Sequence, residues 1–290
     1  LLEIHDVTSA HERGYTGEGV VVAVVDSGVD FSHPDLQGTQ AVIPAGPYAG
    51  WPFSYDVLSG AYYAIDPKNV IHPYDIWEMI GNTQYVSTLP VQGAECTLNE
   101  CQAAVHFVKE DLWKDDAPIR VSWPNRSKSK NYYYTAHPDL LLAYASYSML
   151  INYDEAFFMT PVVIVSDESQ AGVYDTVYVD MNYNYVLGEP GERLTREQPL
   201  GGADLNKDGT WDLSAGMLAW ISDGKHHPPG VAALYPEILS QEPPGAGRLL
   251  AFINDQDGHG TNCASEVAGQ GRITDPYGLG PANPLFAGGE

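Results

Sequence analysis

Five valines and one alanine make up residues 20–25, and this run, which stops at Asp26, constrains the fold most. A continuous β-branched run of this kind is typical of a strand buried on both faces, as in a parallel sheet. The Asp26-Ser27-Gly28 turn places Asp26 at the carboxyl edge of that strand. Ligands and catalytic groups gather at this edge in open α/β sheets. The sequence therefore predicts an α/β fold with a functional aspartate at the edge of a parallel sheet.

A second strand end lies near the other end of the sequence. Residues 249–253 read as a short apolar strand, residues 261–268 read as a helix of small residues, and His259 lies at the turn between them. An aspartate that accepts a hydrogen bond from one imidazole nitrogen fixes the tautomer and leaves the other nitrogen free as a base. A serine nucleophile needs such a base. Asp26 and His259 are therefore the candidate catalytic pair.

Both motifs resemble those of a known family. The segment GEGVVVAVVDSGVDFSHPDL resembles the aspartate motif of the subtilisin-like serine peptidases (subtilases), and DGHGTNCASEVAG resembles their histidine motif. The order, aspartate before histidine with serine expected last, also matches. The resemblance covers residues 6–38 and 247–271. It implies a serine endopeptidase that acts on protein or peptide substrates, with Asp26 as the triad aspartate and His259 as the triad base.

The sequence departs from the family pattern in two ways. Asp26 and His259 are 259 − 26 = 233 residues apart, whereas most subtilases separate them by a few tens of residues. The Gly-Thr-Ser nucleophile motif is also missing, because the Gly-Thr pairs are followed by Gln40, Trp211 and Asn262. The oxyanion asparagine has no counterpart either. We interpret the chain as a truncated catalytic domain that is inactive by itself, with its serine beyond residue 290.

The long spacing predicts the domain organisation. Residues 1–40 and 246–290 are expected to form the incomplete subtilase core, and residues 41–245 a large β-rich insertion. Within it, residues 161–165, 176–179 and 217–221 are the best strand candidates, while residues 103–109 and 138–147 are weaker helix candidates. Loop-closure entropy grows only logarithmically with length, so an insertion of this size is tolerable.

Two acidic loops in the insertion are candidate calcium sites. In the first, oxygen-bearing side chains alternate, a glycine permits a sharp turn, and a final aspartate closes the loop, as in the first part of a calcium-binding loop. The second alternates in the same way but lacks the glycine at the sixth position, so a polar hairpin is the competing interpretation. The predicted ligands are Asp204, Asn206, Asp208, Thr210 and Asp212 in the first loop, and Asp180, Asn182, Asn184 and Glu189 in the second.

The three cysteines suggest different roles. Cys96 and Cys101 lie five residues apart in a polar loop, where a local disulfide and two free thiols are both compatible with the sequence. A disulfide would imply an oxidising compartment. Cys263 follows His259 by one helical turn. Some subtilases carry a cysteine at the matching place, and we expect a small buried thiol that fills space.

Composition excludes several partners. The chain has 14 Lys and Arg against 38 Asp and Glu, a net charge of −24, so it repels nucleic acids and anionic membranes. The longest apolar stretch, residues 140–151, is too short and too interrupted to span a bilayer. The first ten residues lack the features of a signal peptide. The resemblance nevertheless predicts a secreted protein, and the oligomeric state stays unknown.

Two other functions compete with the peptidase. A non-catalytic, secreted, acidic binding module that depends on calcium and uses a subtilase-like frame would explain the missing serine. A Gly-Thr-Ser motif after Glu290 would favour the peptidase over this module. A metallohydrolase would need several histidines at ligand spacing, and His259 has no such neighbour in the sequence.

Overall fold

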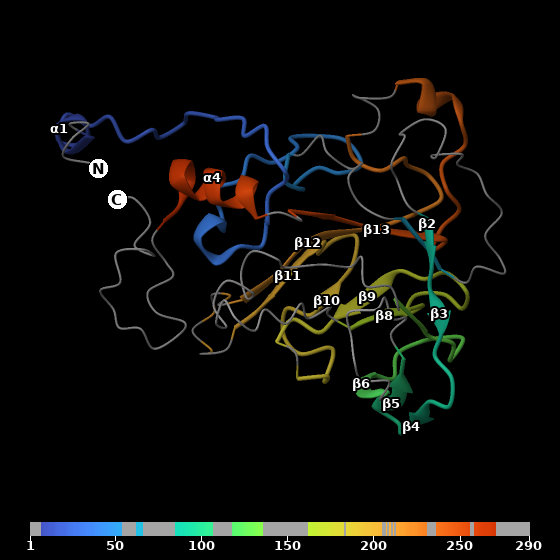
Figure 1. Ribbon diagram of the computed structural model, residues 1–290. Coiled ribbons are helices and arrows are strands. Elements are labelled where there is room, and N and C mark those ends of the chain that lie inside the picture. Colours follow the sequence, from blue (N-terminus) through green and yellow to red (C-terminus); the bar gives the residue numbers. More distant parts are fainter. Residues whose placement is uncertain are drawn as a thin grey trace, which may run out of the picture.

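The computed structural model describes residues 7–53, 62–65, 85–106, 118–135, 162–182, 184–204, 207, 209, 211, 213–230, 236–255 and 258–270. In these ranges the chain forms three β-sheets and few helices, with the sheets stacked beside one another (Figure 1). The helical elements are α1 (Val7–Glu12), the 3-10 helices η1 (Pro34–Leu36) and η2 (Pro236–Ser240), and α4 (His259–Ala268). No helix among the described residues is long and apolar enough to cross a membrane.

The first sheet joins strands from the middle and the end of the chain in the order β11-β12-β13-β1-β2. Neighbours pair antiparallel except β1 and β2, which pair parallel. Its strands are β1 (Tyr62–Ala64), β2 (Tyr85–Ser87), β11 (Leu200–Ala203), β12 (Leu213–Ile221) and β13 (Leu249–Asn254). Strand β13, which the sequence assigned to the subtilase core, thus lies between two strands of the predicted insertion.

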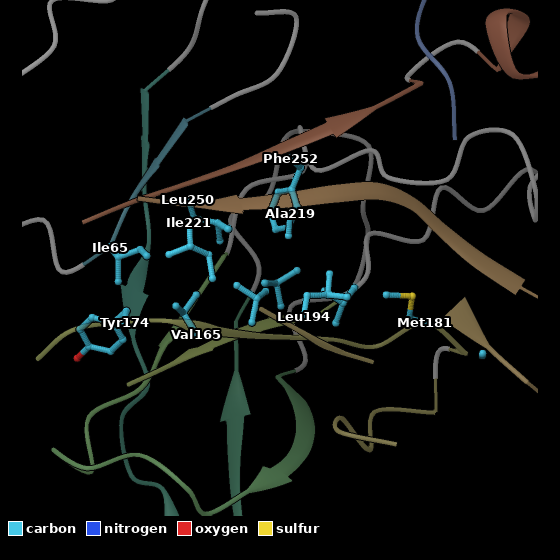
Figure 2. Close-up of a cluster of buried hydrophobic side chains, with 13 residues drawn as sticks. Ile65, Val165, Tyr174, Met181, Leu194, Ala219, Ile221, Leu250 and Phe252 are labelled. Carbon is cyan, nitrogen blue, oxygen red and sulfur yellow. The ribbon is translucent and has the colours of Figure 1, made fainter. Parts of the chain in front are cut away.

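The second sheet is the middle layer, in the order β10-β9-β8-β7-β3, and is antiparallel throughout. Alternate residues of β8 face opposite sides, so Val163 and Val165 pack towards the first sheet and Ile164 packs towards the third. The core between the first two sheets contains side chains from both (Figure 2). The strands of the second sheet are β3 (Leu89–Pro90), β7 (Tyr133–Tyr134), β8 (Val163–Ser166), β9 (Thr176–Val179) and β10 (Arg193–Leu194).

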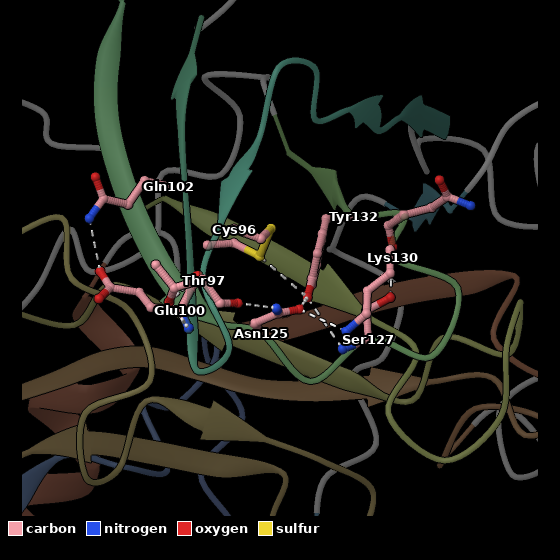
Figure 3. Close-up of a disulfide and its surroundings, with 10 residues drawn as sticks. Cys96, Thr97, Glu100, Gln102, Asn125, Ser127, Lys130 and Tyr132 are labelled. Carbon is pink, nitrogen blue, oxygen red and sulfur yellow. Dashed lines mark hydrogen bonds between the residues drawn. A yellow bond between two sulfur atoms is a disulfide. The ribbon is translucent and has the colours of Figure 1, made fainter.

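The third sheet is a small antiparallel unit, β4-β5-β6, in which a disulfide links Cys96 to Cys101 across the β4–β5 turn (Figure 3). Cys101 is fully buried beside Trp123 and Tyr132 in the second core. Of the two interpretations that the sequence allowed, the structure therefore has the disulfide. The strands are β4 (Glu95–Cys96), β5 (Glu100–Val105) and β6 (Ile119–Pro124).

The valine run does not form the predicted strand. Residues 20–25 have no regular secondary structure, and Val21 and Val25 are 78% and 95% exposed. A strand needs neighbours that accept and donate its backbone hydrogen bonds, and no described strand pairs with this segment. The predicted parallel core is likewise not confirmed, because β13 pairs antiparallel with both of its neighbours.

Other predictions agree better with the structure. The strand over residues 176–179 is confirmed as β9, and those over residues 161–165, 217–221 and 249–253 correspond to β8, β12 and β13 with shifted ends. The helix predicted over residues 103–109 is wrong at its start, because residues 103–105 belong to β5 and fill the second core. The helix predicted over residues 138–147 lies outside the described residues.

Candidate active site

Asp26 and His259 come together despite the 233 residues between them. His259 begins helix α4, and its Nδ1 lies 2.7 Å from Oδ1 of Asp26. An ionised carboxylate only accepts hydrogen bonds, so Nδ1 carries the proton and Nε2 is left as the basic nitrogen. The imidazole is 65% exposed and the carboxyl group 20% exposed, which leaves His259 accessible to a reacting group.

The backbone around Asp26 favours its ionised form. The backbone N–H of Ser27 donates to Oδ1 at 2.7 Å. This hydrogen bond lowers the pKa of Asp26 below its ordinary value, and the hydrogen bond from His259 makes the next largest contribution in the same direction. A carboxylate that stays ionised can hold the Nδ1 proton and stabilise an imidazolium next to it.

Gly260 allows helix α4 to approach the Asp26 loop closely. A Cβ atom at this position would lie 2.0 Å from the carbonyl oxygen of Gly28 and 3.1 Å from Cβ of Asp26. The oxygen belongs to the backbone and cannot move aside as a flexible side chain would. The glycine after His259 is therefore a condition for the pair to form.

Cys263 lies one turn along the same helix, with Sγ 3.6 Å from Nδ1 of His259. It is half-buried, so the expectation of a buried, space-filling thiol is wrong. Desolvation, together with the carboxylate of Asp26, raises the pKa of Cys263. The thiol is therefore protonated at neutral pH and is no rival nucleophile. Among the described residues, Asp26, His259 and Cys263 form a group that could hold a metal ion, and it contains one histidine.

The first predicted calcium loop is described only in part. Asp204 accepts backbone hydrogen bonds from Lys207 at 2.7 Å and from Gly209 at 2.9 Å. Gly209 has a φ of 91°, in keeping with the turn that the sequence predicted. The other four candidate ligands lie outside the described residues: Asn206, Asp208, Thr210 and Asp212.

The second predicted calcium loop is described at all four candidate ligands. The fully buried Asp180 accepts the backbone N–H groups of Asn184 at 3.2 Å and of Tyr185 at 3.0 Å. The side-chain amides of Asn182 and Asn184 each donate to Glu189 at 2.7 Å. The structure therefore gathers the four predicted residues of this loop at one place.

Glu192 joins this loop and was missed from the sequence, because it lies beyond the alternating pattern. It is fully buried and accepts the backbone N–H groups of Met181 and Glu189, both at 3.0 Å. Burial, with a smaller contribution from the nearby carboxylates of Asp180 and Glu189, outweighs those two hydrogen bonds and raises the pKa of Glu192 to about 7. A carboxyl group in such surroundings is either protonated or paired with a positive charge.

Comparison with known proteins gives a family match that spans both Asp26 and His259. The sequence profile of the subtilase family matches residues 17–280, which include both motifs and the segment between them. The chain belongs to the subtilase family. This subtilase is 25% identical to pyrolysin of Pyrococcus furiosus over 267 residues, which are 92% of the chain and 16% of pyrolysin.

Two further relatives match shorter parts of the chain. A subtilisin of Bacillus pumilus is 32% identical over 88 residues, which are 26% of this chain and 32% of that protein. The minor extracellular protease Vpr of Bacillus subtilis is 41% identical over 59 residues, which are 20% of this chain and 6% of Vpr. This subtilase thus spans about a third or less of each of these three relatives. No solved structure matches it significantly.

Behind the pair lies a polar network that the sequence did not predict. Asp255 and Asp30 are both buried, and the hydroxyl of Thr261 lies between them, accepting the backbone N–H of Asp30 at 2.9 Å and donating to Asp255 at 2.7 Å. Asp30 also accepts the hydroxyl of Ser214, on strand β12, at 2.7 Å. The hydrogen-bonded network of this subtilase therefore runs from the first sheet to the helix that carries His259.

Proposed function

We propose that this subtilase supplies the aspartate and the histidine of a serine endopeptidase triad. The observation that carries the proposal is the Asp26–His259 hydrogen bond of 2.7 Å between two family motifs. In this mechanism Nε2 of His259 takes the proton of a serine hydroxyl as the serine attacks a peptide carbonyl, and later gives it to the leaving amine. Asp26 orients the ring and stabilises the imidazolium.

The serine and the oxyanion asparagine are supplied, in this proposal, by residues outside these 290. No Gly-Thr pair of the sequence is followed by serine. The valine run supports the same idea, because an apolar β-branched segment with Val25 95% exposed lacks the cover that stabilises it. Additional strands placed beside residues 20–25 would pair its backbone and bury its side chains. The chain by itself is then catalytically inactive.

Calcium is the proposed structural cofactor. The loop of Asp180, Asn182, Asn184 and Glu189 offers carboxylate and amide oxygens, the hard donors that calcium prefers, and Glu192 adds a buried carboxylate. The Asp204 loop is a second candidate of the same chemistry. Calcium supplies positive charge that offsets the mutual repulsion of these carboxylates, and the chain's own residues position the oxygens.

The proposed substrates are proteins or peptides, and the proposed location is outside the cell. The Cys96–Cys101 disulfide supports an oxidising compartment, and one relative is named an extracellular protease. The net charge of −24 argues against nucleic acids as partners.

A serine-directed fluorophosphonate tests the proposal. The full-length protein that contains this chain should react, and the isolated 290 residues should not. His259→Ala in the full-length protein should abolish both the labelling and peptide hydrolysis. Absence of labelling in the intact full-length protein would contradict the peptidase function and favour a calcium-dependent binding module. Strong labelling of the 290 residues would show a nucleophile within them.

A further inference from the structure

Asp255 holds an unusual set of hydrogen bonds for a residue that touches no reacting atom. It follows strand β13, precedes His259 by four residues and is 3% exposed. Its Oδ1 accepts the hydroxyl of Ser27 at 2.7 Å and the N–H of Gly258 at 2.9 Å. Its Oδ2 accepts both the N–H and the hydroxyl of Thr261 at 2.7 Å. Four donors meet two oxygens, so an ionised carboxylate is the side chain that satisfies all of them.

On one side, Asp255 fixes the start of helix α4. Gly258 takes the N-cap position with a φ of 79° and has no side chain to bond the free N–H groups of the first turn. Asp255 supplies the missing acceptor to Thr261, and its negative charge interacts favourably with the helix N-terminus. Because His259 is the first residue of this helix, the position of its backbone depends on that bond.

On the other side, Asp255 fixes the loop that carries Asp26. The hydroxyl of Ser27 donates to Asp255 and accepts the N–H of Gly260 at 3.0 Å. The backbone N–H of the same serine donates to the carboxylate of Asp26 at 2.7 Å. Ser27 thus connects the carboxylate of Asp26, the first turn of helix α4 and the buried carboxylate of Asp255.

We propose that Asp255 is the positioning residue of the Asp26–His259 pair, acting through Ser27 on the aspartate and through the first turn of α4 on the histidine. Within these 290 residues the valine segment before Asp26 and the imidazole of His259 are exposed. The contacts that align the pair here are the close approach of helix α4 at Gly260 and directional hydrogen bonds to one shared acceptor. The inference deepens the proposed peptidase function and rests on it.

Asp255→Asn is the main test, because asparagine keeps the shape but turns one acceptor oxygen into a donor. In the full-length protein, kcat should fall on the order of 100-fold with KM nearly unchanged, as expected when catalytic groups are displaced by about 1 Å. In proton NMR of the 290-residue chain, the far-downfield signal of the proton shared by Asp26 and His259 should disappear. Ser27→Ala should reduce kcat and the downfield signal by less than Asp255→Asn does. Ser27→Thr, which keeps the hydroxyl group, should leave both close to the wild type.

Asp167→Asn is the matched control. Asp167 is also fully buried and accepts several hydrogen bonds, from the hydroxyl of Ser127 and the N–H groups of Ser129 and Gly172 at 3.3 and 2.6 Å, but it follows strand β8 of the second sheet. This variant should lose stability yet keep the downfield signal and kcat. If both variants lose activity only in proportion to their loss of stability, Asp255 has a structural role alone and the inference is overturned.

The experiments distinguish failure of the proposed peptidase function from failure of the proposed positioning role of Asp255. A wild-type protein that shows the downfield signal but hydrolyses no peptide would contradict the peptidase function, and loss of that signal in Asp255→Asn would still support the positioning role. A variant Asp255→Asn with unchanged signal and unchanged kcat would overturn the positioning role in an active peptidase. If Asp255→Asn fails to fold, the kcat and the downfield signal of Ser27→Ala and Ser27→Thr test the positioning role in its place.

Discussion

The region around Asp26 and His259 and the three-sheet region between the two motifs are stabilised in different ways. In the sheets, Val163, Val165 and Val177 are fully buried between two layers, so the hydrophobic effect holds the strands in place. Near the pair, valines of the same kind are exposed, and buried carboxylates organise the loops. Valine is therefore buried in one region and exposed in the other, because a valine is buried only where neighbouring strands cover it.

Each region also contains an Asp–His pair, and the two pairs differ in what they join. Nδ1 of His226 lies 2.6 Å from Oδ2 of Asp223, with both residues in one loop three positions apart and Arg196 bonded to the same aspartate. The Asp26–His259 pair has nearly the same distance but joins segments 233 residues apart. Distance alone does not distinguish the proposed catalytic pair from a local one, so the proposal rests on the motifs around Asp26 and His259.

Replacing each histidine gives the largest expected difference between the two pairs. In the full-length protein, His259→Ala should lower kcat by several orders of magnitude, because the triad base is lost. His226→Ala should leave kcat within a few-fold of the wild type. Steady-state kinetics with a peptide substrate measure both. Activity of His259→Ala within tenfold of the wild type would refute the assignment.

Removal of calcium should destabilise the three-sheet region. A ligand at 100 times its dissociation constant stabilises the folded state by about 2.7 kcal/mol, so excess chelator should lower the melting temperature by several degrees. Asp180→Asn should lower the melting temperature in calcium and reduce the effect of the chelator. An unchanged melting curve in excess chelator would exclude calcium at both loops.

The Cys96–Cys101 disulfide should contribute somewhat less than calcium to the free energy of unfolding. Closing the short loop between Cys96 and Cys101 restricts the unfolded chain, which corresponds to about 2 kcal/mol for a loop of this size. The double variant Cys96→Ser, Cys101→Ser should therefore unfold at a lower urea concentration. Peptidase activity at low temperature should be unaffected, because the third sheet packs on the side away from helix α4 (Figure 1). Loss of activity without loss of stability would show that the third sheet affects the Asp26–His259 site.

Paired valine substitutions give the smallest effects and test the comparison itself. Val177→Ala removes two buried methyl groups and should cost about 2 kcal/mol of unfolding free energy. Val25→Ala in the 290-residue chain should change it by less than about 0.5 kcal/mol, because Val25 is 95% exposed. Urea unfolding measures both. Equal costs for the two variants would mean that the valine run is buried in solution.

The local pattern predicted some of the fold. The residues of β8, β9 and β12 form short β-branched or apolar runs. Strands β8 and β9, which are buried on both faces, have the nearly continuous apolar sequence expected of such strands. The same reasoning was wrong for residues 20–25, because a sequence pattern records that a strand is apolar but not whether partners lie beside it. The helix predicted at residue 103 was wrong for a related reason. Alternate residues of β5 pack into the second core, and tertiary packing overrides weak helical periodicity.

The sequence alone determined the chemistry of the pair. Asp26 and His259 each lie in a segment that resembles a subtilase motif, and the order of the two motifs matches that family, which was sufficient to predict that these side chains meet. Only the tertiary structure decided how they meet. The chain returns to Asp26 after 233 residues, and Asp255, unremarkable in the sequence, becomes the common acceptor of both halves. Hydrogen bonds between distant segments depend on three-dimensional position, which no local pattern encodes.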